Sequence, residues 1–458
     1  MIQKVGFYAL LLALALAPFL GGNPAGAEYN SDASLGALRV LVLIAALANS
    51  PRTHPLAPSL RAGKGNVALW LAVAWSALSL LIHSKFFTSP FLLFAQIPAV
   101  LDLLCAALVF SLAAKSDESQ RQRIGIALVV GLGIHALMAA QQYGEHKKIG
   151  EDWFRATGLF FSANFSAGFI ALLLPLAFVL CLQAKERLTA LGFGLASALG
   201  FGALIASGSL VGTAATIVGL LVALILGYKQ VTWPRLGIIV LACLVLGFGF
   251  KGAIISRTDT THKQPTTKRG LVDEFRLYTW RGTAKMALTN PVFGTGPGTF
   301  PALYPRYAEV GRTGLAHQSY LQVAAENGIP AALGLLVAAL LALTSARRGN
   351  LVSAALAGGL LAALLRSCFD SEWALLGNSL PFWAVAGLLI PPTNPLPNEE
   401  RVAGEEGRAR NERGEMARSG GERLAAALGL LFALLSQAGI FPSQPKALAD
   451  SGKLAEAA

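Results

Sequence analysis

The polar segment from Lys251 to His317, with Arg276-Leu277-Tyr278-Thr279-Trp280 near its middle, separates two long apolar blocks of this chain. A Gly-rich run follows, Asn290-Pro291-Val292-Phe293-Gly294-Thr295-Gly296-Pro297-Gly298-Thr299-Phe300, and the segment ends at Ala316-His317-Gln318-Ser319-Tyr320-Leu321. A bundle of apolar helices has no structural need for a large basic loop with a single His at its exit. We therefore expect the apolar blocks to form the fold and this segment to carry the chemistry.

The composition indicates a membrane protein. The chain has 458 residues, of which 54% are hydrophobic and only 14% charged, whereas soluble domains carry about 25% charged residues. Repeated apolar runs of roughly 17–25 residues could each cross the ~30 Å hydrocarbon core. Since the runs are continuous and rich in Leu and Ala, they predict helices rather than alternating barrel strands. The expected fold is an all-α, polytopic bundle.

We predict about twelve membrane spans and a helical stretch within the outer loop. A further apolar run, 424–441, is either a thirteenth span or an interfacial helix. The N-terminal run Val5 to Leu20 precedes a small-residue stretch at 23–27, so it is either a removed signal peptide or a retained helix. The spans are predicted at 4–20, 35–50, 66–84, 91–114, 124–142, 166–184, 188–206, 210–227, 236–250, 329–346, 351–368 and 374–391.

These spans divide the chain into an N-terminal bundle, a loop that carries the site, and a C-terminal helical part. Basic residues concentrate in the alternate short loops, which the positive-inside rule assigns to the cytoplasm. The same alternation places 143–165, 251–317 and 369–372 together outside. Residues 393–422 have the mixed-charge composition of a disordered cytoplasmic tail. The predicted units are 1–250, 251–328, 329–391, a tail at 392–423, an apolar helix at 424–441 and a final tail at 442–458.

The outer segment is basic where topology does not require it. Between Lys251 and His317, ten Lys and Arg face four Asp and Glu, a net charge of +6. This balance suits an anionic ligand such as a phosphate or pyrophosphate, although a loop resting on anionic lipid would look the same. The chain's overall +12 lies mostly between helices, so we expect no nucleic-acid partner. The four cysteines lie in apolar runs without metal-ligand spacing.

Within this segment, 273–289 has the pattern of an amphipathic helix whose apolar positions are Leu277, Trp280, Ala284 and Leu288. Arg276 and Trp280 are four residues apart and therefore share one face. Arg276 could then present its planar guanidinium to phosphate while Trp280 anchors at the membrane interface.

The Gly-rich turn and the histidine each allow two interpretations. Gly294, Gly296 and Gly298 could let backbone N–H groups approach an anion, or they could simply form a turn between two elements. His317 could accept a proton from a hydroxyl near neutral pH, or it could be a structural histidine.

Three motifs together resemble the O-antigen ligase / Wzy-type superfamily of polytopic bacterial glycosyltransferases. These motifs are Arg-x-x-x-Trp at 276–280, Pro-Val-Phe-Gly-x-Gly-x-Gly-x-Phe at 291–300, and Ala-His-x-x-Tyr-Leu-Gln-x-x-x-Glu-x-Gly-Ile at 316–329. A fourth element, Arg155-Ala156-Thr157-Gly158-Leu159-Phe160 with Asn164, is similar to the family's Arg-x-x-Gly-x-Phe…Asn pattern. The resemblance covers roughly residues 150–390 and implies a GT-C-like helical bundle in the bacterial inner membrane, with its active site facing the periplasm.

The resemblance implies transfer of a glycan from a polyprenyl-pyrophosphate donor to an acceptor hydroxyl, with inversion and without cofactor or metal. Arg276 would hold the donor pyrophosphate, and His317 would activate or orient the acceptor. Arginines would then stabilise the leaving group electrostatically. Further substrate-binding residues would be Arg155, Asn164, Trp280, Arg281, Gly294, Gly296, Gly298, Arg312 and Gln318.

The chain departs from the family pattern at two positions. Gln318 stands where the family often has Asn, which keeps the amide but lengthens its reach. Leu210 follows Ser209 where the family commonly has a phosphate-contacting Arg. If ligation requires that Arg, then either Arg281 or Arg312 supplies the charge or the protein does a different job.

The sequence leaves the acceptor open. A ligase would use lipid A-core, a polymerase a growing glycan, and a protein O-oligosaccharyltransferase a Ser or Thr. A transporter of lipid-linked sugars would need functional polar groups inside the spans, where this sequence has few. A purely structural scaffold has no use for the combined Arg, Gly and His motifs.

Overall fold

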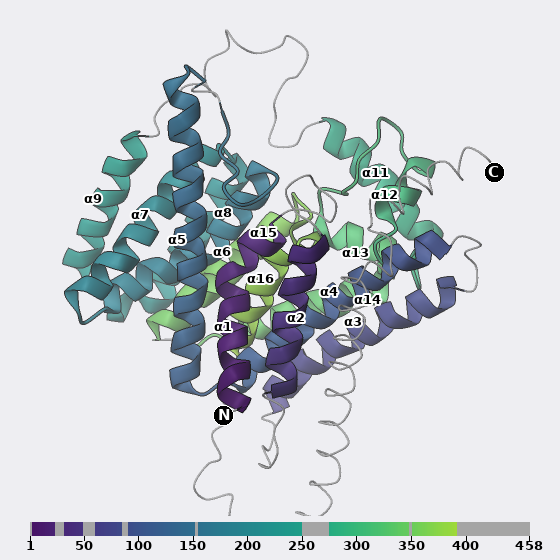
Figure 1. Ribbon diagram of the computed structural model, residues 1–458, viewed down its shortest axis with the longest axis horizontal. Coiled ribbons are helices and arrows are strands. Elements are labelled where there is room, and N and C mark those ends of the chain that lie inside the picture. The colour runs from purple at the N-terminus through teal and green to yellow at the C-terminus, as the bar shows by residue number, and fades with distance from the viewer. Residues whose placement is uncertain are drawn as a thin grey trace, which may run out of the picture.

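The computed structural model describes residues 2–22, 32–48, 60–84, 90–151, 154–249, 274–347 and 350–391. Throughout these ranges the regular elements are helices, and no strand is present (Figure 1). Some predictions concern residues outside these ranges. They are those for 23–27, for 251–273, and for the tails and apolar run of 392–458.

Every predicted span coincides with one helix of the bundle. Seven of them, α1, α3, α4, α5, α6, α7 and α8, are long and apolar enough to cross a membrane, and the apolar helices α2, α9, α14, α15 and α16 are shorter. The chain is thus a multi-pass helical membrane protein, and the count of twelve crossings stays a prediction. The helices are α1 Ile2–Gly21, α2 Asp32–Ala48, α3 Leu60–Ser84, α4 Pro90–Lys115, α5 Glu118–Lys148, α6 Ala163–Gln183, α7 Arg187–Ser207, α8 Leu210–Gly227, α9 Trp233–Gly249, α14 Ile329–Thr344, α15 Leu351–Ser367 and α16 Leu376–Leu389.

Local sequence explains where several helices begin. Asp117 and Gln120 form a reciprocal capping box at the start of α5. Ser162 caps α6 and Ser209 caps α8, each accepting a hydrogen bond from a backbone N–H in the first turn. Gly208 adopts a left-handed φ of 55° between α7 and α8, a conformation that glycine adopts without steric cost. The tight junction allows α8 to reverse direction immediately after α7.

Small residues allow close packing in the centre of the bundle. Helix α15 packs against both α6 and α8. A Cβ atom on Gly219 of α8 would lie 2.6 Å from the carbonyl oxygen of Gly358 in α15, so only glycine permits this approach. Helix α6 is buried along nearly its whole length. The packing fixes the end of α15, which carries the site described below.

A bidentate ion pair joins α2 and α4. The Nε and Nη2 atoms of Arg39 donate to the two carboxylate oxygens of Asp102 at 2.6 and 3.1 Å. The Arg39 side chain is almost fully buried. Because each partner neutralises the other with matched geometry, this pair holds the two helices together.

A smaller helical unit lies to one side of the bundle (Figure 1). It contains α11 Glu274–Thr289, α12 Phe300–Leu303 and α13 Ser319–Asn327, together with the short 3₁₀ helix η2 Tyr304–Arg306. Its own small core includes Met286, Phe300 and Tyr304. This unit is formed by residues 274–327, which belong to the predicted outer loop 251–328.

Helix α11 confirms the helix predicted at 273–289, but the apolar pattern did not identify its packing face. Leu277 and Leu288 are exposed, whereas Thr279 and Thr283 are fully buried. Their hydroxyls donate to the carbonyls four residues earlier. Because these hydrogen bonds satisfy the hydroxyls internally, threonine can be buried where the pattern suggested leucine.

Candidate active site

Asp370 is the centre of the candidate site and lies in the turn between α15 and α16, just before the 3₁₀ helix η3 Glu372–Ala374. Its side chain is 1% exposed. His317 Nδ1 lies 3.0 Å from one carboxylate oxygen, and Nη2 atoms of Arg276 and Arg366 lie 3.4 and 3.7 Å from the other. One buried carboxylate therefore gathers an imidazole and two guanidinium groups from three segments of the chain.

The backbone at His317 is held in an unusual conformation. Its φ of 53° makes it the single non-glycine residue with positive φ among those described. Such a conformation costs of order 1–3 kcal/mol and is typical of functional sites. Trp280 Nε1 donates to the His317 carbonyl at 3.1 Å, and Gln318 caps α13 by accepting from the Leu321 N–H. Trp280 and Gln318 thus fix the backbone that presents the imidazole.

The hydrogen bond to Asp370 sets the state of the imidazole. Since the carboxylate accepts, Nδ1 carries the proton and Nε2 is left as the basic nitrogen. The His317 side chain is 27% exposed, and Nε2 makes no hydrogen bond to any part of the chain that the structure describes. Nε2 is therefore available to accept a proton from a bound hydroxyl.

The pKa values of Asp370 and its neighbour Glu372 shift in opposite directions. Burial alone would raise the pKa of Asp370, but the hydrogen bond from His317 and the positive charges of Arg366 and Arg276 hold it below its usual range. Burial raises the pKa of Glu372 to about 8, although Arg366 opposes this. Three guanidinium groups, those of Arg276, Arg366 and Arg155, thus meet two carboxyl groups in this part of the molecule, so donors outnumber acceptors.

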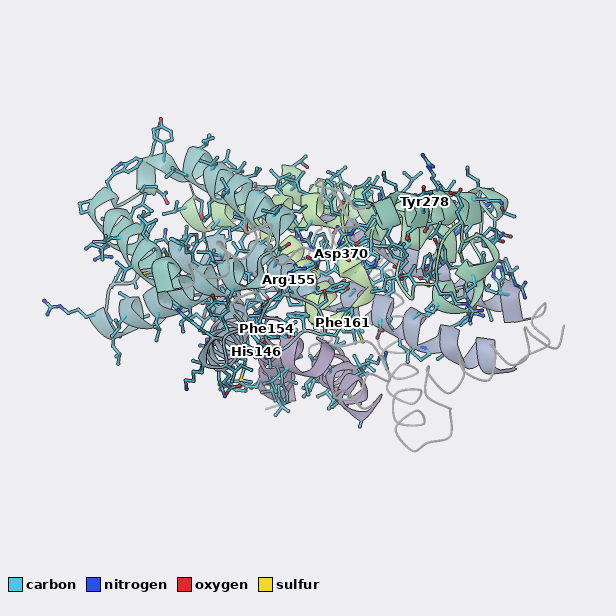
Figure 2. The ribbon with its side chains drawn as sticks, turned by 90° about the horizontal axis from the view of Figure 1, so that it is seen from above. His146, Phe154, Arg155, Phe161, Tyr278 and Asp370 are labelled. Carbon is cyan, nitrogen blue, oxygen red and sulfur yellow. The ribbon has the colours of Figure 1, made fainter. Side chains whose placement is uncertain are left out.

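Arg366 connects this cluster to the motif at Arg155. Its Nη2 atom donates to the Asn164 carbonyl and to Glu372, both at 2.9 Å. Arg155 Nη2 in turn donates to the Asn164 side-chain oxygen at 3.0 Å, and its Nε donates to the Ser207 carbonyl at 2.8 Å. Figure 2 shows Arg155 and Asp370 near the middle of the molecule. Segments separated by more than a hundred residues thus form one polar network.

The Gly-rich turn packs against the end of α13. Gly294, Gly296 and Gly298 all have positive φ, at 65°, 110° and 68°. The N–H groups of Thr295 and Gly296 donate to the carbonyls of Ala325 and Glu326. A Cβ atom on Gly294 would lie 2.4 Å from the Glu326 backbone. Anion binding by this turn stays a prediction, and these two N–H groups already have carbonyl partners.

The other two predicted arginines lie away from the central carboxylate. Arg281 is exposed on α11, with its guanidinium 5.9 Å from the centre of the Tyr278 ring. Arg312 is exposed in the loop before α13. Neither forms an ion pair with Asp370 within the described ranges. Their predicted role in binding substrate remains untested.

The sequence alone did not identify Asp370, Arg366 and Glu372 as site residues. A signal was present, because Arg366 is a charged residue inside a predicted span, where such residues are rare and usually functional. Asp370 follows four residues later, in a short loop predicted on the same side as Arg155 and His317. The side-chain pairing itself appears only when α15 is placed beside α11 and α13.

No group of three or more His, Cys, Asp and Glu side chains is arranged to hold a metal ion within the described ranges. Metal independence nevertheless stays a prediction. The polar groups that meet at Asp370 are mainly donors, which suits an anionic ligand better than a cation.

Comparison with known families supports part of the predicted resemblance. Residues 195–336 match the family described as O-antigen ligase, Wzy_C. The matched region contains Arg276, His317 and the Gly-rich turn, whereas Arg155, Asn164 and Asp370 lie outside it. A search of curated proteins finds no match. Residues 195–336 therefore form an O-antigen ligase family region, which confirms the chain's resemblance to the O-antigen ligase / Wzy-type superfamily.

Proposed function

We propose that this protein is a glycosyltransferase of the bacterial inner membrane that transfers a glycan from a polyprenyl-pyrophosphate donor to an acceptor hydroxyl at the periplasmic face. An O-antigen ligase with a lipid A-core acceptor is the favoured form. The observation that carries the proposal is the 3.0 Å contact between His317 Nδ1 and the buried carboxylate of Asp370.

His317 is suited to act as the general base. With Nδ1–H held by Asp370, Nε2 accepts the acceptor's hydroxyl proton as the acceptor oxygen attacks the anomeric carbon. The bond between the anomeric carbon and the pyrophosphate oxygen breaks in the same displacement. The polyprenyl pyrophosphate leaves with that electron pair, and the anomeric configuration inverts.

Arg276 is suited to stabilise the leaving group. Only its Nη2 atom contacts Asp370, at 3.4 Å, and a guanidinium group has five N–H donors. The remaining donors can bind pyrophosphate oxygens as charge develops on them. Arg155, fixed by Ser207 and Asn164, adds positive charge to the same network. Arginines thus supply the charge balance that a metal gives in other phosphate-transfer sites.

The test is a transfer assay with purified protein and a lipid-linked glycan donor. Replacing His317 with Ala is expected to lower the rate by about a hundredfold to ten-thousandfold, as for loss of a general base. His146→Ala is the matched control, because His146 also pairs with a carboxylate, Glu151. Normal transfer by His317→Ala would contradict the proposed base. Unchanged transfer in excess EDTA would support metal independence.

The acceptor is identified by deleting the gene and finding the carrier on which glycan accumulates. Long chains stranded on the polyprenyl carrier would mean a ligase, because polymerisation survived and transfer failed. Single repeats already attached to the final acceptor would mean a polymerase. Loss of glycan from protein alone would mean a protein O-oligosaccharyltransferase.

A further inference from the structure

A pocket lies at the opposite end of the bundle from Asp370. It has a volume of about 660 Å³ and is bordered by the first turns of α5, α7 and α15 and the last turns of α6 and α16. Helix α15 runs from this pocket at Asn350 to the active-site end at Arg366. The pocket is therefore separated from the candidate active site by the length of a helix.

The pocket is charged at its helix ends and apolar deeper between the helices. Its charged lining consists of Arg121, Lys185, Arg347, Glu118 and Glu186, a net charge of +1. Below them the helices contribute aliphatic and aromatic side chains: Ile126, Leu176, Leu180, Phe193, Leu356 and Leu389. An amphipathic molecule with an anionic head and an apolar tail matches this division.

Two arginines neutralise the carboxyl ends of the helices at this pocket. Arg121 donates to the carbonyls of Leu388 and Ile390 at the end of α16. Arg235 donates to the carbonyls of Leu182 and Ala184 at the end of α6. These interactions offset the negative partial charge of the two carboxyl ends. Arg121 is thus part of the pocket wall, and its donors are largely used by the protein.

Lys185 and Arg347 are the cations that remain available. Both side chains are exposed, and neither makes a side-chain hydrogen bond or ion pair within the described residues. Arg347 lies close enough to Arg121 for their charges to repel. In addition, Glu186 at the start of α7 makes no side-chain capping bond, so backbone N–H groups there stay open. An anion between these groups would relieve the repulsion.

We propose that this pocket binds the phosphate headgroup of an anionic membrane lipid. Lys185 and Arg347 contact the phosphate, and an acyl chain lies along Ile126, Leu176 and Phe193. A lipid is favoured over a free phosphate because about half of the lining is apolar and lies between helices that cross the membrane. This site is independent of the glycosyl-transfer proposal.

The experiment is native mass spectrometry of the purified full-length protein with phosphatidylglycerol or phosphatidylcholine. Wild type is expected to bind phosphatidylglycerol in preference. The double variant Lys185→Ala/Arg347→Ala is expected to bind it about thirtyfold more weakly, the effect of two cations near a membrane surface. The matched control is Arg123→Ala/Lys229→Ala, which removes two exposed cations outside the pocket lining. This control is expected to bind like wild type.

A second variant tests the apolar part without changing any charge. Gly125 lines the pocket, and a Cβ atom built there meets only Leu176, at 3.9 Å. Gly125→Leu therefore extends into the pocket and is expected to weaken phosphatidylglycerol binding while the protein stays folded. His317→Ala is expected to bind the lipid normally, which separates this site from the transfer reaction.

Several outcomes would overturn the proposal. Undiminished phosphatidylglycerol binding by Lys185→Ala/Arg347→Ala is one, and equal binding of phosphatidylcholine by wild type is another. If the Arg123→Ala/Lys229→Ala control lost as much affinity for phosphatidylglycerol, the binding would depend on general surface charge and not on this pocket. Displacement of the lipid by inorganic phosphate at similar concentration would assign the pocket to a free anion.

Discussion

Two carboxylates of this molecule, Asp102 and Asp370, both pair with arginine inside the helical bundle but in different ways. Asp102 receives one arginine, Arg39, through two short hydrogen bonds. Asp370 receives Arg276, Arg366 and His317 at 3.0 to 3.7 Å. The first arrangement is neutral and matched in shape. The second brings three cationic or imidazole groups to a single negative charge.

The difference separates a structural ion pair from a site with binding capacity. A matched pair uses the planar fork of arginine for two hydrogen bonds and keeps two helices in register. At Asp370, two arginines and a histidine converge on one carboxylate, so guanidinium N–H groups are left for a ligand. The strained backbone of His317 occurs only at the second site. We expect substitutions at the two carboxylates to have distinct effects on transfer and on stability.

The largest expected effect on transfer is that of Asp370→Asn. The amide keeps the shape of the side chain but no longer favours the Nδ1–H tautomer of His317, and an equivalent loss in another enzyme lowers turnover by about ten-thousandfold. Asp102→Asn is the control and is expected to lower thermal stability with little change in rate. Comparable rates for the two variants would remove the distinction between the sites.

Arg366→Met is expected to have the largest effect on stability. It leaves buried Asp370 without one of its cations and removes one of the two partners of Glu372, the other being the Asn378 amide. Loss of one partner costs about 3–5 kcal/mol in other buried pairs. The double variant Arg366→Met/Glu372→Met replaces that pair with apolar groups and is expected to recover part of the stability. Unfolding in detergent measures both. A double variant less stable than the single one would show that the hydrogen bond from Asn378 to Glu372 matters more than the unpaired charge.

Glu326 is a third carboxyl group to compare with Asp102 and Asp370. It is buried, and it accepts hydrogen bonds from backbone N–H groups and not from arginine. Burial raises its pKa from 4.5 to about 7, although hydrogen bonds from Phe300 and Gly298 lower it. The proton is held more tightly in the folded state, so this group's stabilising contribution is complete below pH 4.5 and is lost as pH rises through about 7. Asp370 has the opposite sign, because its lowered pKa gives stability that is lost as pH falls.

The measurement for Glu326 is the melting temperature between pH 4.5 and 8 for wild type and Glu326→Gln. The amide cannot titrate, so the variant is expected to lose less stability than wild type as pH rises. Parallel curves for the two proteins would mean that Glu326 does not take up a proton in this range.

The smallest expected effect is that of Arg281→Ala and Arg312→Ala. Both side chains are exposed and unpaired with Asp370, so we expect the KM for the donor to rise by about two- to fivefold with kcat unchanged. Steady-state kinetics distinguishes this outcome. A large loss of kcat in either variant would move that arginine into the reaction itself, as a replacement for the charge missing at Leu210.

Much of the architecture could be predicted from the apolar pattern. Each predicted span coincides with a helix, because a run of Leu and Ala in lipid has few alternatives to a helix. The helix 273–289 and the placement of Arg276 and Trp280 on one face were also correct. The packing face of α11 was missed, since buried Thr279 and Thr283 satisfy their hydroxyls by hydrogen bonds that composition does not reveal.

The candidate site was predicted only in part. His317 and Arg276 were identified because their types and spacing are distinctive, and the structure brings them within reach of one carboxylate. Trp280 and Gln318 contact the His317 backbone or cap the helix beside it, and their role in binding substrate is untested. Asp370 was overlooked because nothing local distinguishes it from other loop charges, and the signal of a charged Arg366 inside a predicted span was not followed.

The sequence by itself determined that the chain is a helical membrane protein and that Arg276 and His317 are the residues to test. These features depend on local composition and on spacing along one helix. Only the tertiary structure decided that Asp370 lies between His317, Arg276 and Arg366, and that Arg155 joins the same network through Asn164. The physical reason is that a buried carboxylate takes its charge state from neighbours brought by distant segments, and those neighbours are set by the packing of α15 against α6 and α8.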